Sequence, residues 1–236
     1  MSTGTSIPRR TVRLAWAADV ATIADIQARA FRDRLPGALS GAVATAELQA
    51  AWRAAVSRPP TARHRVLVAA ESADPLSGLS GASDGPELIA GPELSVGGGA
   101  VVGFAATGPA GDPDAVPGAD GEVLALHTAL ADEALLAALL TAAADTLEAD
   151  GFGRAQLWVA ADDDRLRRVA DSAGWLPDGA HRRLAADPTD GAEQAGLELA
   201  QIRLHIGLAG DDAAADPPVT DLPVTGPPIS DPPTPG

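Results

Sequence analysis

Cysteine and tyrosine are absent from this chain of 236 residues, and aromatic side chains make up only 3% of it. Without Cys, the chain can form no disulfide, no thiolate nucleophile and no Cys-based zinc site, and we expect no metal centre. It also lacks a run of about 18 apolar residues, so we expect no membrane span. Residues 1–10 contain two arginines with no apolar stretch behind them, which is unlike a secretory signal, and we expect a cytoplasmic protein.

The chain is strongly acidic, with 32 acidic against 17 basic residues and a formal net charge of −15. Such a charge repels a phosphate backbone, so we expect neither a nucleic-acid nor a membrane partner. The strongest basic cluster consists of Arg165, Arg167 and Arg168, backed by Arg182 and Arg183. We interpret this cluster as a solvated helix face or as a contact to an anionic ligand.

Apolar periodicity divides the chain into short strands and helices. Alternating or continuous apolar runs predict strands over 11–15, 65–70, 100–105, 121–126, 155–159, 181–184 and 199–206. Helical spacing predicts helices over 20–32, 45–56, 134–147 and 165–172, with Asp19 as the cap of the first and Trp52 in the core. Together these elements predict one mixed α/β domain over residues 11–208, preceded by an N-terminal extension over 1–10.

Two further segments differ from the rest in composition. Residues 72–99 are rich in Gly, Ser and Pro, and so long a connection predicts a flexible insertion between two paired strands. Residues 209–236 are acidic and Pro-rich without an aromatic residue, so they cannot bury enough apolar area to fold. We expect this tail to be disordered.

The stretch 121–175 organises the chain, because it places two strands around one long helix. The helix is expected to end at Gly151, since Gly readily adopts the left-handed conformation found at helix ends. The return to the second strand is short. A strand–helix–strand unit of this kind predicts a parallel pair of strands with a right-handed crossover.

The layout of this unit, which ends in Ala173-Gly174-Trp175, resembles the centre of the GNAT superfamily of N-acetyltransferases. The strand at 11–15 followed by the helix at 20–32 is similar to the first strand and helix of that family. The resemblance implies a mixed central sheet flanked by helices. It implies acetyl-CoA as the acyl donor, an amine-bearing small molecule or protein as the acceptor, and is compatible with a homodimer.

The family binds the pyrophosphate at a turn of the form (Q/R)-x-x-G-x-(G/A), and this turn falls on Ala131, Ala134 and Leu136. By resemblance, the donor would contact the end of the preceding strand, this turn and the next helix. These positions are Leu126, His127, Ala131, Asp132, Glu133, Ala134, Leu135, Leu136 and Arg165. The motif letters themselves are replaced, and Asp132 and Glu133 are most simply a helix cap and a first-turn charge. The family's usual Tyr position is held by Ala170, which leaves water, Ser172 or no specific group for the leaving thiolate.

Two residues are candidates for the base that takes the proton of the amine. Glu122 opens the central strand and His127 closes it, and either carboxylate or imidazole can do this work. The simpler interpretations are a charge at the start of a strand and a hydrogen-bonded histidine at its end. His205 lies on the last strand, and the sequence does not assign its face.

Three hypotheses remain open at this point. The first is acyl-CoA-dependent N-acyl transfer, and the second is a catalytically degenerate domain of the same fold that acts as a binding or regulatory module. The replaced turn and the absent Tyr motivate the second hypothesis. The third is an unrelated α/β domain without a CoA link, which a sheet without splayed central strands would favour.

Overall fold

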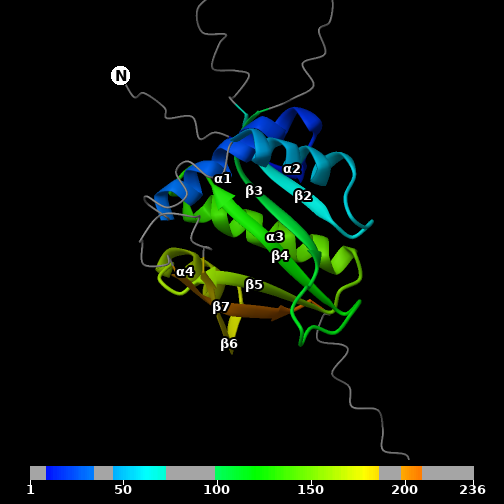
Figure 1. The fold of residues 1–236 in the computed structure, drawn as a ribbon, viewed down its shortest axis with the longest axis vertical. Coiled ribbons are helices and arrows are strands. Elements are labelled where there is room, and N and C mark those ends of the chain that lie inside the picture. Colours follow the sequence, from blue (N-terminus) through cyan, green and yellow to red (C-terminus); the bar gives the residue numbers. More distant parts are fainter. Residues whose placement is uncertain (1–8, 35–44, 73–98, 186–197, 209–236) are drawn as a thin grey trace, which may run out of the picture.

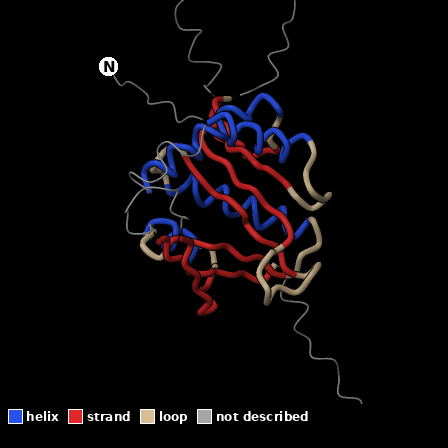
Figure 2. Tube along the Cα trace, viewed as in Figure 1, coloured by secondary structure: helices blue, strands red, loops and turns tan. Residues whose placement is uncertain are grey.

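In the computed structural model, which describes residues 9–34, 45–72, 99–185 and 198–208, seven strands form one sheet (Figures 1 and 2). The strands in chain order are β1 (Arg9–Leu14), β2 (Arg65–Ser72), β3 (Ala100–Pro109), β4 (Asp120–Thr128), β5 (Arg154–Ala160), β6 (Leu176–Ala185) and β7 (Glu198–Gly207). Across the sheet they follow the order β1-β2-β3-β4-β5-β7-β6. The helices are the single 3-10 turn η1 (Ala17–Asp19), α1 (Val20–Arg34), α2 (Thr45–Ser57), α3 (Glu133–Ala149) and α4 (Asp164–Ser172).

The helices cover the two faces of the sheet and create two cores. On one face, α1 and α2 pack Ile23 and Trp52 against Phe104, and Trp52 meets the Phe104 ring edge-on at 4.9 Å. On the other face, α3 and α4 pack against β4, β5 and their neighbours through a larger apolar cluster that includes Leu139 and Trp175. Trp52 therefore lies in the core, as predicted.

Strand pairing confirms the expected mixed topology. Only β4 and β5 pair in parallel among the described strands, and α3 makes the crossover between them. The neighbouring pairs β1–β2, β2–β3, β3–β4, β5–β7 and β6–β7 are antiparallel. The α/β class, the single domain and the flanking helices were therefore predicted correctly.

Helix α3 forms where its sequence and its ends both favour a helix. Leu139, Leu140, Ala143 and Leu147 recur at helical spacing and are fully buried. At the C-terminal end, Gly151 adopts φ +83°, and the amides of Gly151 and Phe152 donate to the carbonyls of Glu148 and Leu147. These two bonds satisfy carbonyls that the helix leaves unpaired.

Three predictions need correction. β1 begins at Arg9 rather than at residue 11, because Arg9 and Arg10 continue the ladder with β2 and Arg10 pairs with Glu71. β6 spans 176–185 rather than 181–184, with an irregularity between Pro177 and His181 that disguises its first half. Asp19 does not begin α1 as its cap, because its carboxylate accepts the Trp16 amide 2.7 Å away.

The remaining predictions about segments lie outside the described residues. They concern most of the expected insertion (73–98), the tail (209–236) and the first eight residues of the expected N-terminal extension.

Candidate active site

The two central strands, β4 and β5, separate part-way along their length. Their register pairs Asp120–Val123 with Arg154–Leu157 and ends there. Beyond that point β4 remains paired with β3 as far as Thr128, whereas β5 pairs with β7 as far as Ala160. From Leu124 onward, the edge of β4 that faces β5 therefore has no strand partner in the described part of the chain.

A bulge in β4 marks the start of this separation. Ala106 of β3 pairs with Ala125, and the next residue, Thr107, pairs with Val123, so Leu124 is the extra residue. A bulge of this kind bends the strand and leaves backbone groups outside the ladder. A small cavity of about 160 Å³ lies between the separated strands, lined by residues 123–127 of β4 and 157–160 of β5.

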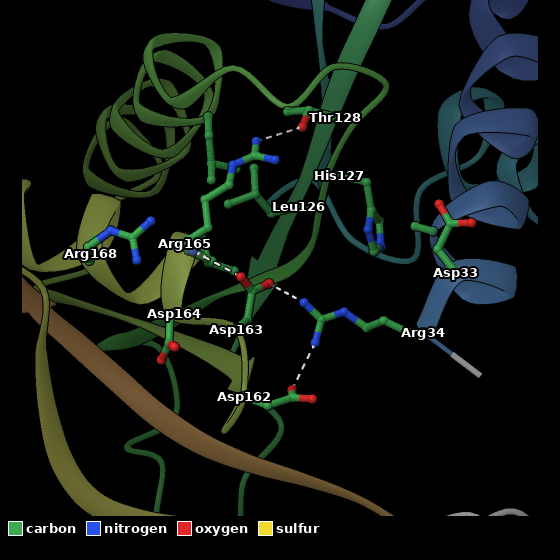
Figure 3. A pocket seen from close by; sticks show the side chains of 13 residues that line it. Asp33, Arg34, Leu126, His127, Thr128, Asp162, Asp163, Asp164, Arg165 and Arg168 are labelled. Carbon is green, nitrogen blue, oxygen red and sulfur yellow. Dashed lines mark hydrogen bonds and ion pairs between the residues drawn. The ribbon is translucent and has the colours of Figure 1, made fainter. Parts of the chain in front are cut away.

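A larger cavity of about 720 Å³ opens at the wide end of this wedge (Figure 3). Its wall combines the end of β4, the first turn of α4 and the end of α1. Arg34 of α1 crosses the opening and pairs with Asp163 and, at 3.3 Å, with Asp162. The lining residues are Ala30, Asp33, Arg34, Leu126, His127, Thr128, Leu136, Asp162, Asp163, Asp164, Arg165, Leu166 and Arg168.

His127 lies at the wall of both cavities, on the α1 side of β4. Its ring is 5.4 Å from that of Phe104 and meets Phe31 edge-on at 6.1 Å. Burial, together with the nearby Arg34, lowers the pKa of His127 to about 4. The imidazole is therefore neutral at pH 7 and is a weak base.

The turn before α3 is occupied by groups of the protein itself. Asp132 caps the helix, because its Oδ1 accepts the Leu135 amide at 3.1 Å, and its carboxylate also pairs with Arg10. The hydrogen bond from Arg10, followed by that from the Leu135 amide, lowers the pKa of Asp132, so the carboxylate stays ionised. The cap predicted for Asp132 is confirmed.

Arg165 braces the same turn from α4. Its Nη2 lies 3.3 Å from Thr128 Oγ1, 3.4 Å from the Leu130 carbonyl and 3.4 Å from the Asp132 carbonyl. The turn therefore directs carbonyl oxygens toward an arginine, while its first helical amides face the Asp132 carboxylate. Both features differ from a turn that offers only free amides to a phosphate.

The other residues suggested by the resemblance occupy varied positions. Leu135 and Leu136 are buried in the α3-side core, and Leu136 also lines the large cavity. Ala131 and Ala134 are exposed, and Glu133 pairs with the exposed Arg168 at 3.3 Å. The large cavity thus brings together Leu126, His127, Leu136 and Arg165, whereas Ala131, Asp132, Glu133, Ala134 and Leu135 do not line it.

Glu122 lies at the other end of the wedge, one residue before the strands separate. Its side chain leaves the sheet on the face opposite to Val123, and it is buried. The Gly111 amide donates to Glu122 Oε2 at 3.3 Å. Burial raises the pKa of Glu122, and the nearby Asp112 carboxylate raises it further, whereas the Gly111 amide, Arg182 and Gln156 lower it.

Glu122 and His127 are too far apart to act on one nitrogen atom. They lie five positions apart on β4, which corresponds to roughly 17 Å along an extended strand. The raised pKa of Glu122 makes it a stronger base than an ordinary glutamate, whereas the lowered pKa of His127 makes it a weaker base than an ordinary histidine. Of the two candidates, Glu122 therefore has the chemistry of a general base.

Sequence reasoning missed several residues around the wedge. Arg34 ends α1 and gives no motif signal, although it crosses the opening. Asp112 and Arg203 belong to a polar network beside Glu122, and they meet only because a loop folds back onto β5 and β7. Ser172, considered for the leaving thiolate, donates to the Arg168 carbonyl on α4 and lines neither cavity of the wedge.

No protein-family model matches the chain, and no curated protein matches it in sequence. Solved structures do match it over most of its length. The yncA protein of Salmonella typhimurium, solved with its cofactor acetyl-CoA, has a TM-score of 0.55 and 19% identity, covering 88% of this chain and 98% of its own. An N-acetyltransferase from Staphylococcus aureus Mu50 has a TM-score of 0.58 and 14% identity, covering 85% and 99%. A GCN5-related N-acetyltransferase from Kribbella flavida has a TM-score of 0.54 and 16% identity, covering 84% and 97%.

The separated central strands and these similarities together define the class of fold. The chain has the fold of the GNAT superfamily of N-acetyltransferases, and its splayed central strands do not favour the third hypothesis, which expected a sheet without them. Among the described residues, no helix combines the length and hydrophobicity that crossing a membrane requires.

Proposed function

We propose that this protein transfers an acyl group, most simply acetyl, from acyl-CoA to an amine. The observation that carries the proposal is the wedge between β4 and β5. Its β4 edge presents backbone N–H and C=O groups beyond Val123 that pair with no strand among the described residues. Such groups are strong hydrogen-bonding sites, and an extended ligand with amide groups can pair with them as an added strand does.

The pantetheine arm of CoA is an extended chain with two amides, so it suits this edge. Its thioester end would lie at the narrow end of the wedge, next to Glu122. The small inner cavity of about 160 Å³ favours a short acyl group. The fit of the arm is therefore supported by both shape and hydrogen-bonding chemistry.

The phosphates of CoA fit the opposite end less directly. Asp132 holds a negative charge at the N-terminus of α3, but Arg34, Arg165 and Arg168 line the adjoining cavity. The pair between Arg34 and Asp162 is exposed, with Asp162 85% accessible, so it contributes little and a phosphate can replace it. Arginine side chains would then hold the phosphates in the cavity.

Acyl transfer to an amine needs a proton acceptor beside the thioester. The amine nitrogen bonds to the acyl carbon, the carbon–sulfur bond breaks, the amine loses a proton and the thiolate gains one. We assign the removal of the amine proton to Glu122, whose raised pKa matches this role. The net charge of −15 also favours the approach of cationic amines, whether small molecules or protein groups.

A calorimetric titration of acetyl-CoA tests the proposal. Ala30 lines the large cavity from α1, so Ala30→Trp should narrow it, whereas Ala21→Trp adds the same ring to an exposed position of the same helix. We expect saturable binding by the wild type and by Ala21→Trp, and at least tenfold weaker binding by Ala30→Trp. Absence of saturable heat with the wild type would overturn the proposal.

A thiol-release assay with a panel of amines then tests the chemical step. We expect release with at least one amine, and a strong loss of rate in Glu122→Gln with little change in acetyl-CoA binding. Binding of acetyl-CoA without release by any amine would instead support a binding or regulatory module.

A further inference from the structure

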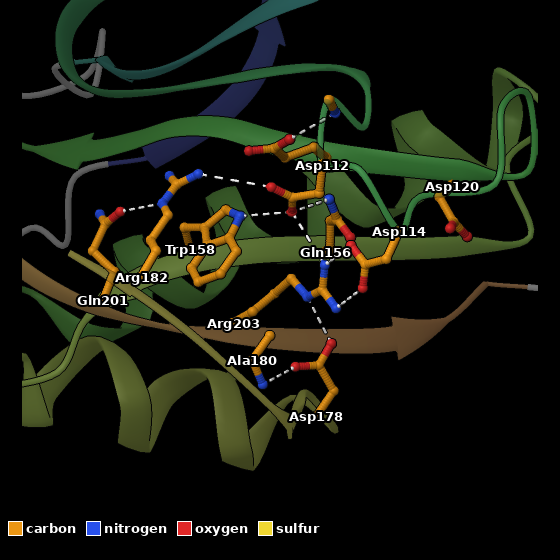
Figure 4. A network of polar contacts seen from close by, with 12 residues as sticks. Asp112, Asp114, Asp120, Gln156, Trp158, Asp178, Ala180, Arg182, Gln201 and Arg203 are labelled. Carbon is orange, nitrogen blue, oxygen red and sulfur yellow. Dashed lines mark hydrogen bonds and ion pairs between the residues drawn. The ribbon is translucent and has the colours of Figure 1, made fainter. Parts of the chain in front are cut away.

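The loop between β3 and β4 is anchored to the sheet through one carboxylate, that of Asp112, whose side chain is 13% exposed. Asp112 Oδ2 accepts hydrogen bonds from Gln156 Nε2 at 2.8 Å, from Trp158 Nε1 at 2.8 Å and from Arg203 Nη1 at 3.2 Å (Figure 4). Gln156 and Trp158 are alternate residues of β5, and Arg203 is the register partner of Trp158 on β7. All three donors therefore project from one face of the sheet toward Asp112.

Arg203 joins this loop to β6 as well. Arg203 is 7% exposed, and its guanidinium contacts Asp178 at 2.7 Å and Asp114 at 2.7 Å, in addition to Asp112. A buried charge is costly unless it is paired and hydrogen-bonded, and here three carboxylates meet that need. The hydrogen bond that Asp114 accepts from Arg203 is the main cause that lowers the pKa of Asp114 to about 2. The loop is thus held by charge as well as by neutral hydrogen bonds.

The anchored loop reaches the proposed base. Gly111, directly before Asp112, donates its amide to Glu122 Oε2 at 3.3 Å. Gln156 is 2% exposed, lies opposite Glu122 in the β4–β5 register, donates to the Asp112 carboxylate and lowers the pKa of Glu122. Glu122 therefore faces two groups of this loop. One is the Gly111 amide, which the anchoring of Asp112 holds in place, and the other is the Asp112 carboxylate itself.

We propose that Asp112 is a positioning residue for Glu122, which fixes the Gly111 amide against the Glu122 carboxylate and places a second negative charge beside it. Its bearing on catalysis rests on the proposed function, whereas its effect on Glu122 does not. The negative charge makes a proton on Glu122 easier to keep, and the Gly111 amide limits that effect. The pKa of Glu122 remains above the ordinary value of a glutamate.

Other groups face Glu122 from the elements packed around it. Arg182 of β6 lowers the pKa of Glu122, and its guanidinium lies 4.2 Å from the Trp158 ring centre. His205 of β7 shares the row of Glu122 and Gln156, and its Nδ1 is buried without a hydrogen-bond partner in the described part of the chain. His64 lies against Gly108, which is the β3 partner of Glu122. A test must therefore change Asp112 and leave these groups in place.

Asp112→Asn makes this change, because it removes the charge and keeps a carbonyl oxygen for the three donors. We expect the titration midpoint of Glu122 to fall by roughly half to one pH unit. The midpoint is read by NMR of ¹³C-labelled glutamate carboxyls, with Glu122 assigned from the Glu122→Gln spectrum. Asp114→Asn is the matched control, because Asp114 binds the same Arg203 from the same loop but is 61% exposed. It should leave the midpoint unchanged.

The outcomes decide the proposal without requiring an active enzyme. An unchanged midpoint in Asp112→Asn, or an equal shift in Asp114→Asn, would overturn it. If thiol release is observed, the acid limb of kcat/KM should move to lower pH in Asp112→Asn, with KM for acetyl-CoA unchanged. A uniform loss of kcat at every pH would instead indicate a merely structural role. Should Asp112→Asn fail to fold, Asp112→Ser keeps a hydroxyl acceptor and carries the same test.

Discussion

The environment of His127 makes the stability of the fold depend on pH in a predictable direction. In the unfolded chain its pKa has the ordinary value near 6.5, whereas burial and Arg34 lower it to about 4 in the folded state. Between pH 6.5 and pH 4, His127 is therefore protonated in the unfolded chain but stays neutral in the folded protein. Stability is fully present above pH 6.5 and is lost as the pH falls toward 4.

The size of the effect follows from the two pKa values. Lowering the pKa of His127 from 6.5 to about 4 corresponds to about 3.4 kcal/mol of stability, of which about 2 kcal/mol is already lost at pH 5. This window lies above the range in which the paired aspartates titrate. The raised pKa of Glu122 acts in the opposite direction, because protonation then favours the folded state.

Urea unfolding of the wild type and of His127→Gln at pH 7 and pH 5 isolates this contribution. Glutamine is neutral at both values, so every other group, Glu122 included, contributes equally to both proteins. We expect the free energy of unfolding to fall by about 2 kcal/mol more in the wild type than in the variant. Equal losses in the two proteins would refute the assignment of a buried, neutral His127.

Two further substitutions test the turn before α3 and the packing behind β4. Asp132→Ser keeps a capping oxygen but removes the negative charge at the N-terminus of α3. Calorimetry should therefore show about tenfold tighter binding of acetyl-CoA by this variant. Asp145→Ser, farther along α3, is the control and should leave the affinity for acetyl-CoA unchanged. An unchanged Kd in Asp132→Ser would contradict a phosphate position near this turn. Gly121→Ala places a Cβ 2.7 Å from Leu147 Cδ2, so chemical denaturation should show a loss of about 1–3 kcal/mol. Gly153→Ala, which meets no atom within 4 Å, is its control, and equal stability of the two variants would exclude the clash.

Much of the fold was predictable because local pattern and final packing agree. The strand–helix–strand unit at 121–175 was predicted because apolar spacing, the Asp132 cap and Gly151 all mark the same boundaries. β6 was predicted too short because Pro177 and Gly179 interrupt its pattern, while pairing with β7 still extends the strand. Asp19 was wrongly predicted to cap α1, because a carboxylate can accept backbone amides on either side of it and here accepts the amide of the preceding Trp16.

The site was less accessible to sequence reasoning, since its properties depend on contacts between distant segments. Glu122 and His127 were selected by residue type, but their pKa values shift in opposite directions because of how the chain folds around them. Burial, followed by the Asp112 carboxylate, raises the pKa of Glu122, whereas burial, followed by Arg34, lowers that of His127. Neither environment is adjacent in sequence to the residue it affects. The bulge at Leu124 likewise appears only in the register between β3 and β4.

Hydrogen–deuterium exchange with and without acetyl-CoA tests the central claim most directly, because it reports on the β4 edge itself. We predict that acetyl-CoA slows exchange of backbone amides over residues 124–128, which lack a β5 partner, and leaves β1 and β2 unchanged. This result would place the donor in the wedge between the separated strands. Unchanged exchange over 124–128 at saturating acetyl-CoA would contradict the account, whatever catalytic activity the protein shows.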